Sequence, residues 1–278
     1  MSRTLKLGIV QPHRILDDPE AREREYLSRL EFAGRSGVDL ALLPEDLRGA
    51  LTDDGFDSAV AESIPGPFSS KLSALASAHK MWIAACQYER DGDTIWNTAY
   101  LIDRTGAIAG KYRKVHEAEL YRTQFNVQVG ADYPVFDTEF GRIGLMVCFD
   151  NIFPETSRLL ALNGAELILF PDANFHPSEF DVETLARARA IDNGVWIARA
   201  SYAVDVYTPG QWIGRSCLIS PDGIIRADAG RTPGVLVCEA DLDAERKVVG
   251  YGTWGINAVR DRIRVERRPE TYHRLSER

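Results

Sequence analysis

The chain has 278 residues, of which 45% are hydrophobic and 27% charged, and its formal net charge is −8 at pH 7. This composition is typical of a soluble globular protein with a sizeable core and excludes a disordered chain. The negative charge argues against nucleic acid as a partner, because such a partner needs a broad basic surface. No apolar run is long enough for a signal peptide or a membrane span, so we expect a cytoplasmic protein that does not bind membranes.

The first half of the chain alternates short apolar strands with helices. In order, the pattern predicts a strand at 5–10, a helix at 20–36, a strand at 38–43, a helix at 68–79 and a strand at 81–88. This alternation is typical of a mostly parallel, buried sheet. A hairpin at 94–102 and 107–112 then adds antiparallel strands, and 114–133 is predicted to be a loop with one helical turn.

The same order returns in the second half. After a hairpin at 135–138 and 142–147, the pattern predicts a helix at 154–162, a strand at 166–170, a helix at 182–193 and a strand at 195–201, with further strands at 216–220 and 234–240. No linker separates the two series. We therefore expect an α/β fold in one domain over 1–278, with two similar halves packed sheet against sheet. Residues 241–278 form a charged, irregular extension that we expect to pack on the domain or on a partner subunit.

The four cysteines are scattered without paired spacing, which argues against a disulfide framework. The five histidines do not show metal-ligand spacing either, so we expect no metal site. Cys148 stands out because it ends the apolar run at 143–147, just before a predicted helix. A helix N-terminus beside a thiol lowers its pKa from about 8.5 and favours the nucleophilic thiolate. The alternative is that Cys148 is a small buried residue of the core, as most free cysteines are.

Three residues that suit one reaction follow predicted strands. They are Glu45, Lys114 and Cys148. Ligands gather at the carboxyl ends of strands in open α/β sheets. A thiol can form a thioester, a carboxylate can move its proton, and a lysine can stabilise a tetrahedral oxyanion together with the backbone N–H of Phe149. The combination predicts hydrolysis through a thioester.

The segments around these residues resemble the three catalytic motifs of the nitrilase superfamily, the carbon–nitrogen hydrolases. The motifs read L-L-P-E at 42–45, K-Y-R-K-V-H at 111–116 and G-L-M-V-C-F-D-N-I-F-P-E at 144–155. Further stretches that match are W-N-T-A-Y-L-I-D-R-T-G at 96–106, R-A-R-A-I-D-N at 187–193, G-R-S-C-L-I-S-P-D-G at 214–223 and R-R-P-E-T-Y at 267–272.

This resemblance implies a four-layer α-β-β-α sandwich and hydrolysis of a small amide, carbamoyl compound or nitrile without a cofactor. It also implies Cys148 as nucleophile, Glu45 as general base and acid, Lys114 as oxyanion stabiliser, and a homodimer or higher homo-oligomer. Family members carry a second glutamate that hydrogen-bonds the lysine. Of two candidates we prefer Glu119 over Glu117, because E-L-Y-R-T-Q-F at 119–125 is similar to a run in one amidase branch.

The bond that is cut is predicted from the residues after the cysteine. An aromatic residue followed by Asp, as in Phe149-Asp150, is more frequent in amidases than in nitrile-cleaving members, so an amide is preferred. Asn174 and Phe175 are predicted pocket walls, and Asp172 either binds a substrate amine or caps the next segment. Alternatives are an N-carbamoyl hydrolase, a nitrilase and a catalytically silent binding homologue. Arg187, Arg189 or Arg199 would bind the carboxylate of an N-carbamoyl amino acid, although structural ion pairs are preferred for the arginines on the helix.

Overall fold

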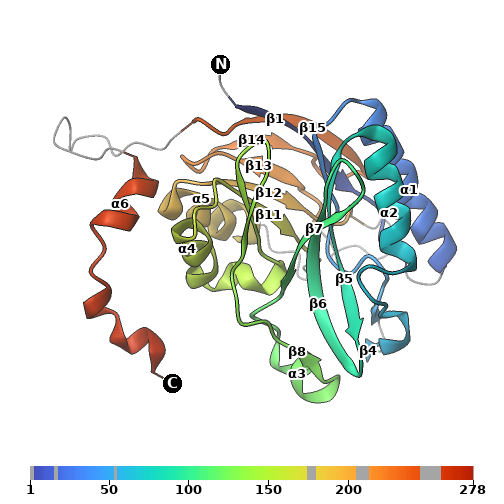
Figure 1. The fold of residues 1–278 in the computed structure, drawn as a ribbon, viewed down its shortest axis with the longest axis horizontal. Helices are drawn as coiled ribbons and strands as arrows, with labels where there is room; N and C mark the ends of the chain where they lie inside the picture. Colours follow the sequence, from blue (N-terminus) through green and yellow to red (C-terminus); the bar gives the residue numbers. More distant parts are fainter. Residues whose placement is uncertain are drawn as a thin grey trace.

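The protein is an α-β-β-α sandwich in which two mixed sheets face each other and helices cover both outer faces (Figure 1). The computed structural model describes residues 3–15, 18–52, 55–173, 180–204, 213–244 and 258–277. The predicted fold class is confirmed. None of the helices in these ranges is long and apolar enough to cross a membrane.

The first sheet has the strand order β15-β1-β2-β5-β6-β7, and β8 pairs with β6. Its central strands β1, β2 and β5 are parallel and are connected through α1 and α2, as the predicted alternation requires. The bounds are β1 Thr4–Gln11, α1 Pro19–Arg35, β2 Leu40–Leu42, α2 Pro67–His79, β5 Trp82–Asp91, β6 Thr94–Ile102, β7 Ile108–Arg113, β8 Val127–Gln128 and β15 Gly234–Asp241.

The second sheet has the order β14-β13-β12-β11-β10-β9, and its parallel strands are β10, β11 and β12. The helix predicted at 182–193 consists of a π-helical segment, Asp181–Ala186, followed by α5. The bounds are β9 Val135–Asp137, β10 Arg142–Leu145, α4 Pro154–Leu162, β11 Leu167–Pro171, α5 Arg187–Asn193, β12 Trp196–Ala200, β13 Cys217–Ile219 and β14 Ile225–Asp228.

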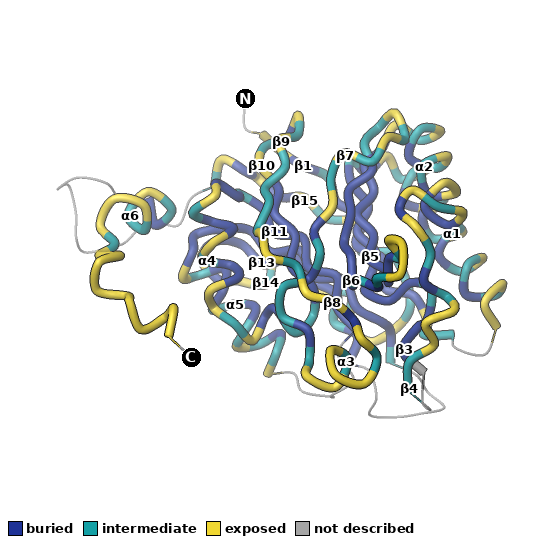
Figure 2. The backbone as a smooth tube through the Cα atoms, turned by 60° about the horizontal axis from the view of Figure 1, so that its bottom comes forward, coloured by how far each residue is buried: buried dark blue, intermediate teal, exposed yellow. Residues whose placement is uncertain are grey.

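Several short elements join the strands. They are the hairpin β3 Leu51–Thr52 and β4 Gly55–Phe56, the helix α3 Glu119–Gln124, and 3-10 segments at Ser58–Val60, Cys148–Ile152, Pro269–Thr271 and His273–Ser276. The helix α6, Val259–Val265, lies in the stretch predicted to be irregular. It packs against α4 and α5, and the remaining C-terminal residues to 277 are largely exposed (Figure 2).

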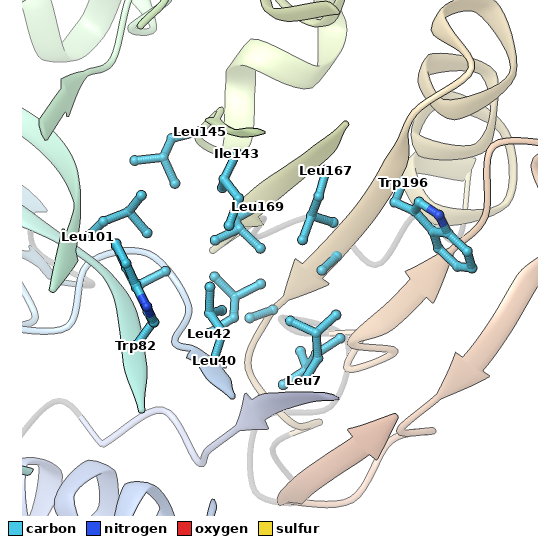
Figure 3. Packing of buried hydrophobic residues seen from close by; sticks show 14 of the residues in the cluster. Leu7, Leu40, Leu42, Trp82, Leu101, Ile143, Leu145, Leu167, Leu169 and Trp196 are labelled. Carbon is cyan, nitrogen blue, oxygen red and sulfur yellow. The ribbon is translucent and has the colours of Figure 1, made fainter. Parts of the chain in front are cut away.

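The central core lies between the two sheets (Figure 3). Alternate residues of a strand point to opposite faces, so Leu40 and Leu42 of β2 face the second sheet whereas Ala41 faces the helices. From the other sheet, Leu167 and Leu169 of β11 fill the same layer. All five side chains are fully buried. Burial of apolar surface between the sheets therefore holds the carboxyl ends of both sets of parallel strands side by side.

The helices cover the outer faces with amphipathic surfaces. Tyr26 and Leu30 of α1 pack on the first sheet together with Leu72 of α2. On the second sheet, Leu160 of α4 and Ala190 of α5 do the same. This arrangement leaves the strand ends, where the loops emerge, as the place where polar side chains from both sheets meet.

Candidate active site

Glu45 lies three residues after the end of β2 and is only 2% exposed. Its Oε1 accepts hydrogen bonds from Asn97 Nδ2 at 2.7 Å and from Lys114 Nζ at 3.0 Å. The backbone turns here because Asp46 adopts a left-handed conformation with φ 55°, and the Tyr202 hydroxyl donates to the Glu45 carbonyl oxygen at 2.7 Å. The turn therefore fixes a buried carboxylate in a defined orientation.

Lys114 directly follows β7 and forms ion pairs with two carboxylates. Its Nζ lies 3.0 Å from Glu45 Oε1 and 3.4 Å from Glu117 Oε2. Burial alone would lower the pKa of Lys114, but Glu117 and Glu45 outweigh it and raise this pKa well above its usual value. The lysine consequently stays charged and can stabilise a second negative group, such as an oxyanion.

The structure assigns the lysine contact to Glu117 and not to Glu119, which corrects the preference drawn from the sequence. Glu117 is 6% exposed and lies three residues after Lys114, where the chain turns back over the lysine. Burial raises the pKa of Glu117 to about 7, with a further contribution from Glu45, although Lys114 and Asn97 act in the opposite direction. Glu119 begins the exposed helix α3, and its side chain faces solvent.

Cys148 occupies a sharp turn between β10 and the 3-10 segment Cys148–Ile152. Its φ is 43°, a left-handed conformation that costs a non-glycine residue on the order of 1 kcal/mol or more. The predicted elbow is therefore present, although a 3-10 turn precedes the α-helix that was expected to follow directly. Phe149 lies in the first turn of this segment, where N–H groups have no partner within the helix. Its N–H can therefore serve a ligand.

Asp150 holds this turn in place. Its carboxylate accepts hydrogen bonds from the Val147 N–H at 2.9 Å, from the Tyr112 hydroxyl at 2.7 Å and from the His116 N–H at 3.1 Å. A fourth contact joins Asp150 Oδ1 and His116 Nδ1 at 2.9 Å. Asp150 is fully buried, so these contacts replace water around the carboxylate. Sequence reasoning used Asp150 only as a motif residue and missed this role.

The environment of Cys148 does not favour the free thiolate, contrary to the expectation from the sequence. Burial raises the pKa of the Cys148 thiol well above its usual value, and the carboxylates of Glu45 and Asp172 act in the same direction. Lys114 opposes them without reversing the outcome. A helix N-terminus lowers a thiol pKa only where burial does not outweigh it. For Cys148 to act as a nucleophile, a neighbouring base must therefore remove its proton.

The carboxylate of Glu45 lies close to this thiol. The Cys148 sulfur, a Glu45 carboxylate oxygen and an Asp172 carboxylate oxygen all lie within 4.8 Å of one another. A thiol and two carboxylates are also a possible donor set for a metal ion. However, Glu45 is paired with Lys114, and Asp172 is paired with Arg199 through the Arg199 Nε at 2.8 Å. Both carboxylates thus already have a cationic partner.

The remaining residues that were predicted to line the pocket differ in where the structure places them. Asp172 lies beside Cys148, directly after β11, but its partner is the fully buried Arg199. Arg187 donates to the Gly223 carbonyl, and Arg189 donates to the Asn151 and Ile152 carbonyls, so all three arginines make contacts within the protein. Asn174 and Phe175 lie outside the described residues.

An aromatic cluster adjoins the two glutamates and was not predicted. Tyr88 on β5 is the direct cross-strand partner of Asn97, so their side chains lie on one face of the sheet. Phe56 packs edge-on against Tyr88 and stacks with Phe125, which in turn contacts Tyr121. The Tyr88 hydroxyl is buried and, within the described residues, has no hydrogen-bond partner. The cluster offers a mostly apolar wall that includes the buried hydroxyl of Tyr88.

Comparisons with known proteins agree with this geometry. A family model described as carbon-nitrogen hydrolase matches residues 6–248. The chain is 32% identical over 283 residues to a nitrilase of Pyrococcus abyssi, covering 97% of this chain and 100% of that protein. It is 29% identical over 224 residues to an omega-amidase of Homo sapiens, covering 77% and 81% respectively.

Among solved structures, the fold is similar to that of a cysteine-to-alanine mutant of an amidase from Nesterenkonia AN1, which belongs to the nitrilase superfamily. The TM-score is 0.81 at 21% identity, covering 99% of this chain and 97% of that chain. The same amidase is also known in complex with butyramide.

Proposed function

The chain belongs to the carbon–nitrogen hydrolase family, and we propose that it hydrolyses a small amide through a thioester on Cys148. One observation carries the proposal. The Cys148 sulfur and a carboxylate oxygen of Glu45 lie within 4.8 Å, and Lys114 Nζ lies 3.0 Å from the same glutamate. A nucleophile, a base and a cation are thus together at the carboxyl ends of strands from both sheets.

In the proposed first step, Glu45 removes the thiol proton and the sulfur attacks the amide carbonyl carbon. Lys114 Nζ and the Phe149 N–H stabilise the resulting oxyanion. The tetrahedral intermediate collapses, the carbon–nitrogen bond breaks, and the protonated Glu45 gives its proton to the leaving amine. The products of this step are a thioester on Cys148 and free ammonia or an amine.

In the second step, Glu45 removes a proton from water, which attacks the thioester carbonyl. The second oxyanion uses the same two donors. Its collapse releases the carboxylic acid, and the proton on Glu45 returns to the sulfur of Cys148. We further propose that Glu117 keeps Lys114 in position throughout, because it forms the second ion pair of the lysine and is buried beside it.

Two other substrate classes compete with a small amide, and the structure supports them less well. An N-carbamoyl amino acid would need a cation for its carboxylate, but Arg187, Arg189 and Arg199 each make contacts within the protein. A nitrile is kept as a candidate because one relative is named a nitrilase. A small amide is preferred because a structural neighbour, an amidase, binds butyramide, and the aromatic cluster around Tyr88 would suit an apolar acyl chain.

A panel of matched substrates tests the proposal. Butyramide, butyronitrile, an ω-amide and an N-carbamoyl amino acid should be compared by release of ammonia and of carbon dioxide. We expect amides to give ammonia without carbon dioxide, at a kcat/KM at least about tenfold above that of the nitrile, which corresponds to about 1.4 kcal/mol. Release of carbon dioxide in equal amount would instead favour the carbamoyl hydrolase. Binding without turnover across the panel would favour a silent binding homologue.

A further inference from the structure

The side chain of Asn97 joins the two glutamates of the site. Asn97 lies on β6 and is 1% exposed. Its Nδ2 donates to Glu45 Oε1 at 2.7 Å and lies 3.4 Å from Glu117 Oε2 as a second acceptor. An amide nitrogen carries two hydrogens, so one group can serve both carboxylates. Lys114 also contacts both Glu45 and Glu117. The side chains of Asn97, Glu45, Lys114 and Glu117 therefore form a closed ring of contacts.

The orientation of the Asn97 amide is set by Cys86. The Cys86 thiol on β5 donates to Asn97 Oδ1, with a sulfur–oxygen distance of 3.3 Å. Burial raises the pKa of Cys86 well above its usual value, so the thiol remains protonated and stays a donor. A flipped amide would place its carbonyl oxygen against two carboxylates. The contact with Cys86 therefore favours the single orientation in which the NH2 group faces Glu45 and Glu117.

The two donors to Glu45 share one oxygen. Asn97 Nδ2 and Lys114 Nζ both bind Oε1, and in the described part of the chain no donor to Oε2 is found. The carboxylate cannot rotate without losing both contacts. Hydrogen bonds to a charged group are stronger than those between neutral groups, so the two together hold the carboxylate firmly.

We infer that Asn97, oriented by Cys86, is a positioning residue that keeps Oε2 of Glu45 free to exchange the proton with the Cys148 sulfur. The inference rests on the proposed function, in which Glu45 is the base. The competing explanation is that Asn97 only satisfies buried carboxylates. The two explanations differ in what they predict for the reactivity of Cys148.

Asn97→Leu is the main test, and Thr98→Val is its matched control. Thr98 lies next to Asn97 on the opposite face of β6, is fully buried, and donates to Glu89 Oε2 at 2.8 Å. Both variants remove a buried hydrogen bond to a glutamate from one strand. We expect Asn97→Leu to lower kcat about 10- to 100-fold with KM changed less than about threefold, and Thr98→Val to leave both near wild type.

Alkylation of Cys148 by iodoacetamide, located by peptide mass mapping, gives a second readout. Loss of the oriented base slows alkylation in Asn97→Leu, whereas a merely loosened structure exposes the partly buried thiol further and speeds alkylation. Faster alkylation, or equal kcat and alkylation rates in Asn97→Leu and Thr98→Val, would overturn the inference.

If Asn97→Leu does not fold, a comparison of kcat between Cys86→Ser and Cys86→Ala tests the inference instead. The serine keeps a donor to Asn97 Oδ1 and the alanine does not, so we expect kcat to fall several-fold further in Cys86→Ala. Equal kcat values in the two variants would contradict the inference. Absence of turnover by the wild type on the whole substrate panel would refute the proposed function instead. The alkylation comparison would still test the role of Asn97, because it needs no substrate.

Discussion

Glu117 and Glu119 are two residues apart in the sequence but lie in opposite environments. Glu117 is buried between Lys114 and Asn97, whereas Glu119 is exposed at the first residue of α3. Their matched Gln variants separate a site role from a general effect of charge. We expect Glu117→Gln, assayed above pH 7 where Glu117 is mostly ionised, to lower kcat/KM at least about tenfold, because the lysine loses an ionic partner, and Glu119→Gln to change it less than twofold. Similar effects in the two variants would contradict the assignment.

The raised pKa of Glu117 also predicts how stability depends on pH. The pKa rises from 4.5 to about 7 on folding, mainly through burial, so the folded state holds this proton more tightly than the unfolded chain. The resulting destabilisation begins as pH rises above 4.5 and is complete above about 7. It amounts to at most about 3 kcal/mol.

Glu117→Gln removes this dependence. Its unfolding free energy relative to wild type should therefore rise between pH 5 and pH 8, as measured by chemical denaturation. Glu119→Gln is the control and should show no such trend. A relative stability of Glu117→Gln that is flat or falls with pH would show that Glu117 is not protonated in the folded protein near neutrality.

At the scale of elements, the two strand-end turns that carry Glu45 and Cys148 are built alike. Each contains a left-handed residue, Asp46 or Cys148, and each is held by a buried aspartate. Asp46 accepts from the Ala50 N–H at 2.7 Å, and Asp150 accepts from the Val147 N–H at 2.9 Å. Strain at the turn is thus balanced by hydrogen bonds to a neighbouring carboxylate.

Asp150→Ala tests whether this hydrogen bonding positions the nucleophile. The variant leaves the Val147 N–H, the Tyr112 hydroxyl and the His116 N–H without their acceptor, so we expect a loss of about 2–4 kcal/mol in unfolding free energy together with a fall in kcat of at least about tenfold.

The control is Asp103→Ala. Asp103 also accepts several turn hydrogen bonds, but in an exposed hairpin. It should lose some stability and keep its kcat. Unchanged kcat in a destabilised Asp150→Ala would make Asp150 purely structural.

The elements were predictable where a local pattern specifies them. The apolar runs and their helical connections predicted the parallel strands at the centre of both sheets, and the positions of Glu45, Lys114 and Cys148 after strands predicted that these residues lie together. Local pattern does not reveal which polar side chain on a strand faces the site. Asn97 stood in a matching motif without a role, because its contacts depend on two turns from other parts of the sequence. Glu45 comes from the turn after β2, and Glu117 comes from the turn after β7, whose course has no period.

For the whole molecule, the sequence predicted two similar halves but not how they interlock. β15 is the last strand in the sequence. It pairs antiparallel with β1 over its full length and so belongs to the sheet of the first half. Pairing between strands so distant in sequence leaves no periodic signal. The predicted low pKa of the Cys148 thiol was wrong for a similar reason. A helix N-terminus is visible in the sequence, whereas the packing that raises the thiol pKa appears only when both sheets are in place.

The C-terminal extension is predicted to pack on the domain or on a partner subunit, and in the structure its helix α6 packs on the domain. α6 packs on α4 and α5, but Val265 and Leu275 are 66% and 70% exposed. We keep the predicted homo-oligomer as a proposal, to be decided by light scattering of the purified protein.

The central claim is that a carbon–nitrogen bond is broken by covalent attack from Cys148. The turnover of Cys148→Ala on the best amide of the panel tests it most directly, with folding checked by circular dichroism and thermal unfolding. We expect a folded protein whose kcat/KM is lower by about a thousandfold or more, since no other group replaces the thiol as nucleophile. A folded Cys148→Ala protein that retains turnover within tenfold of wild type would contradict it.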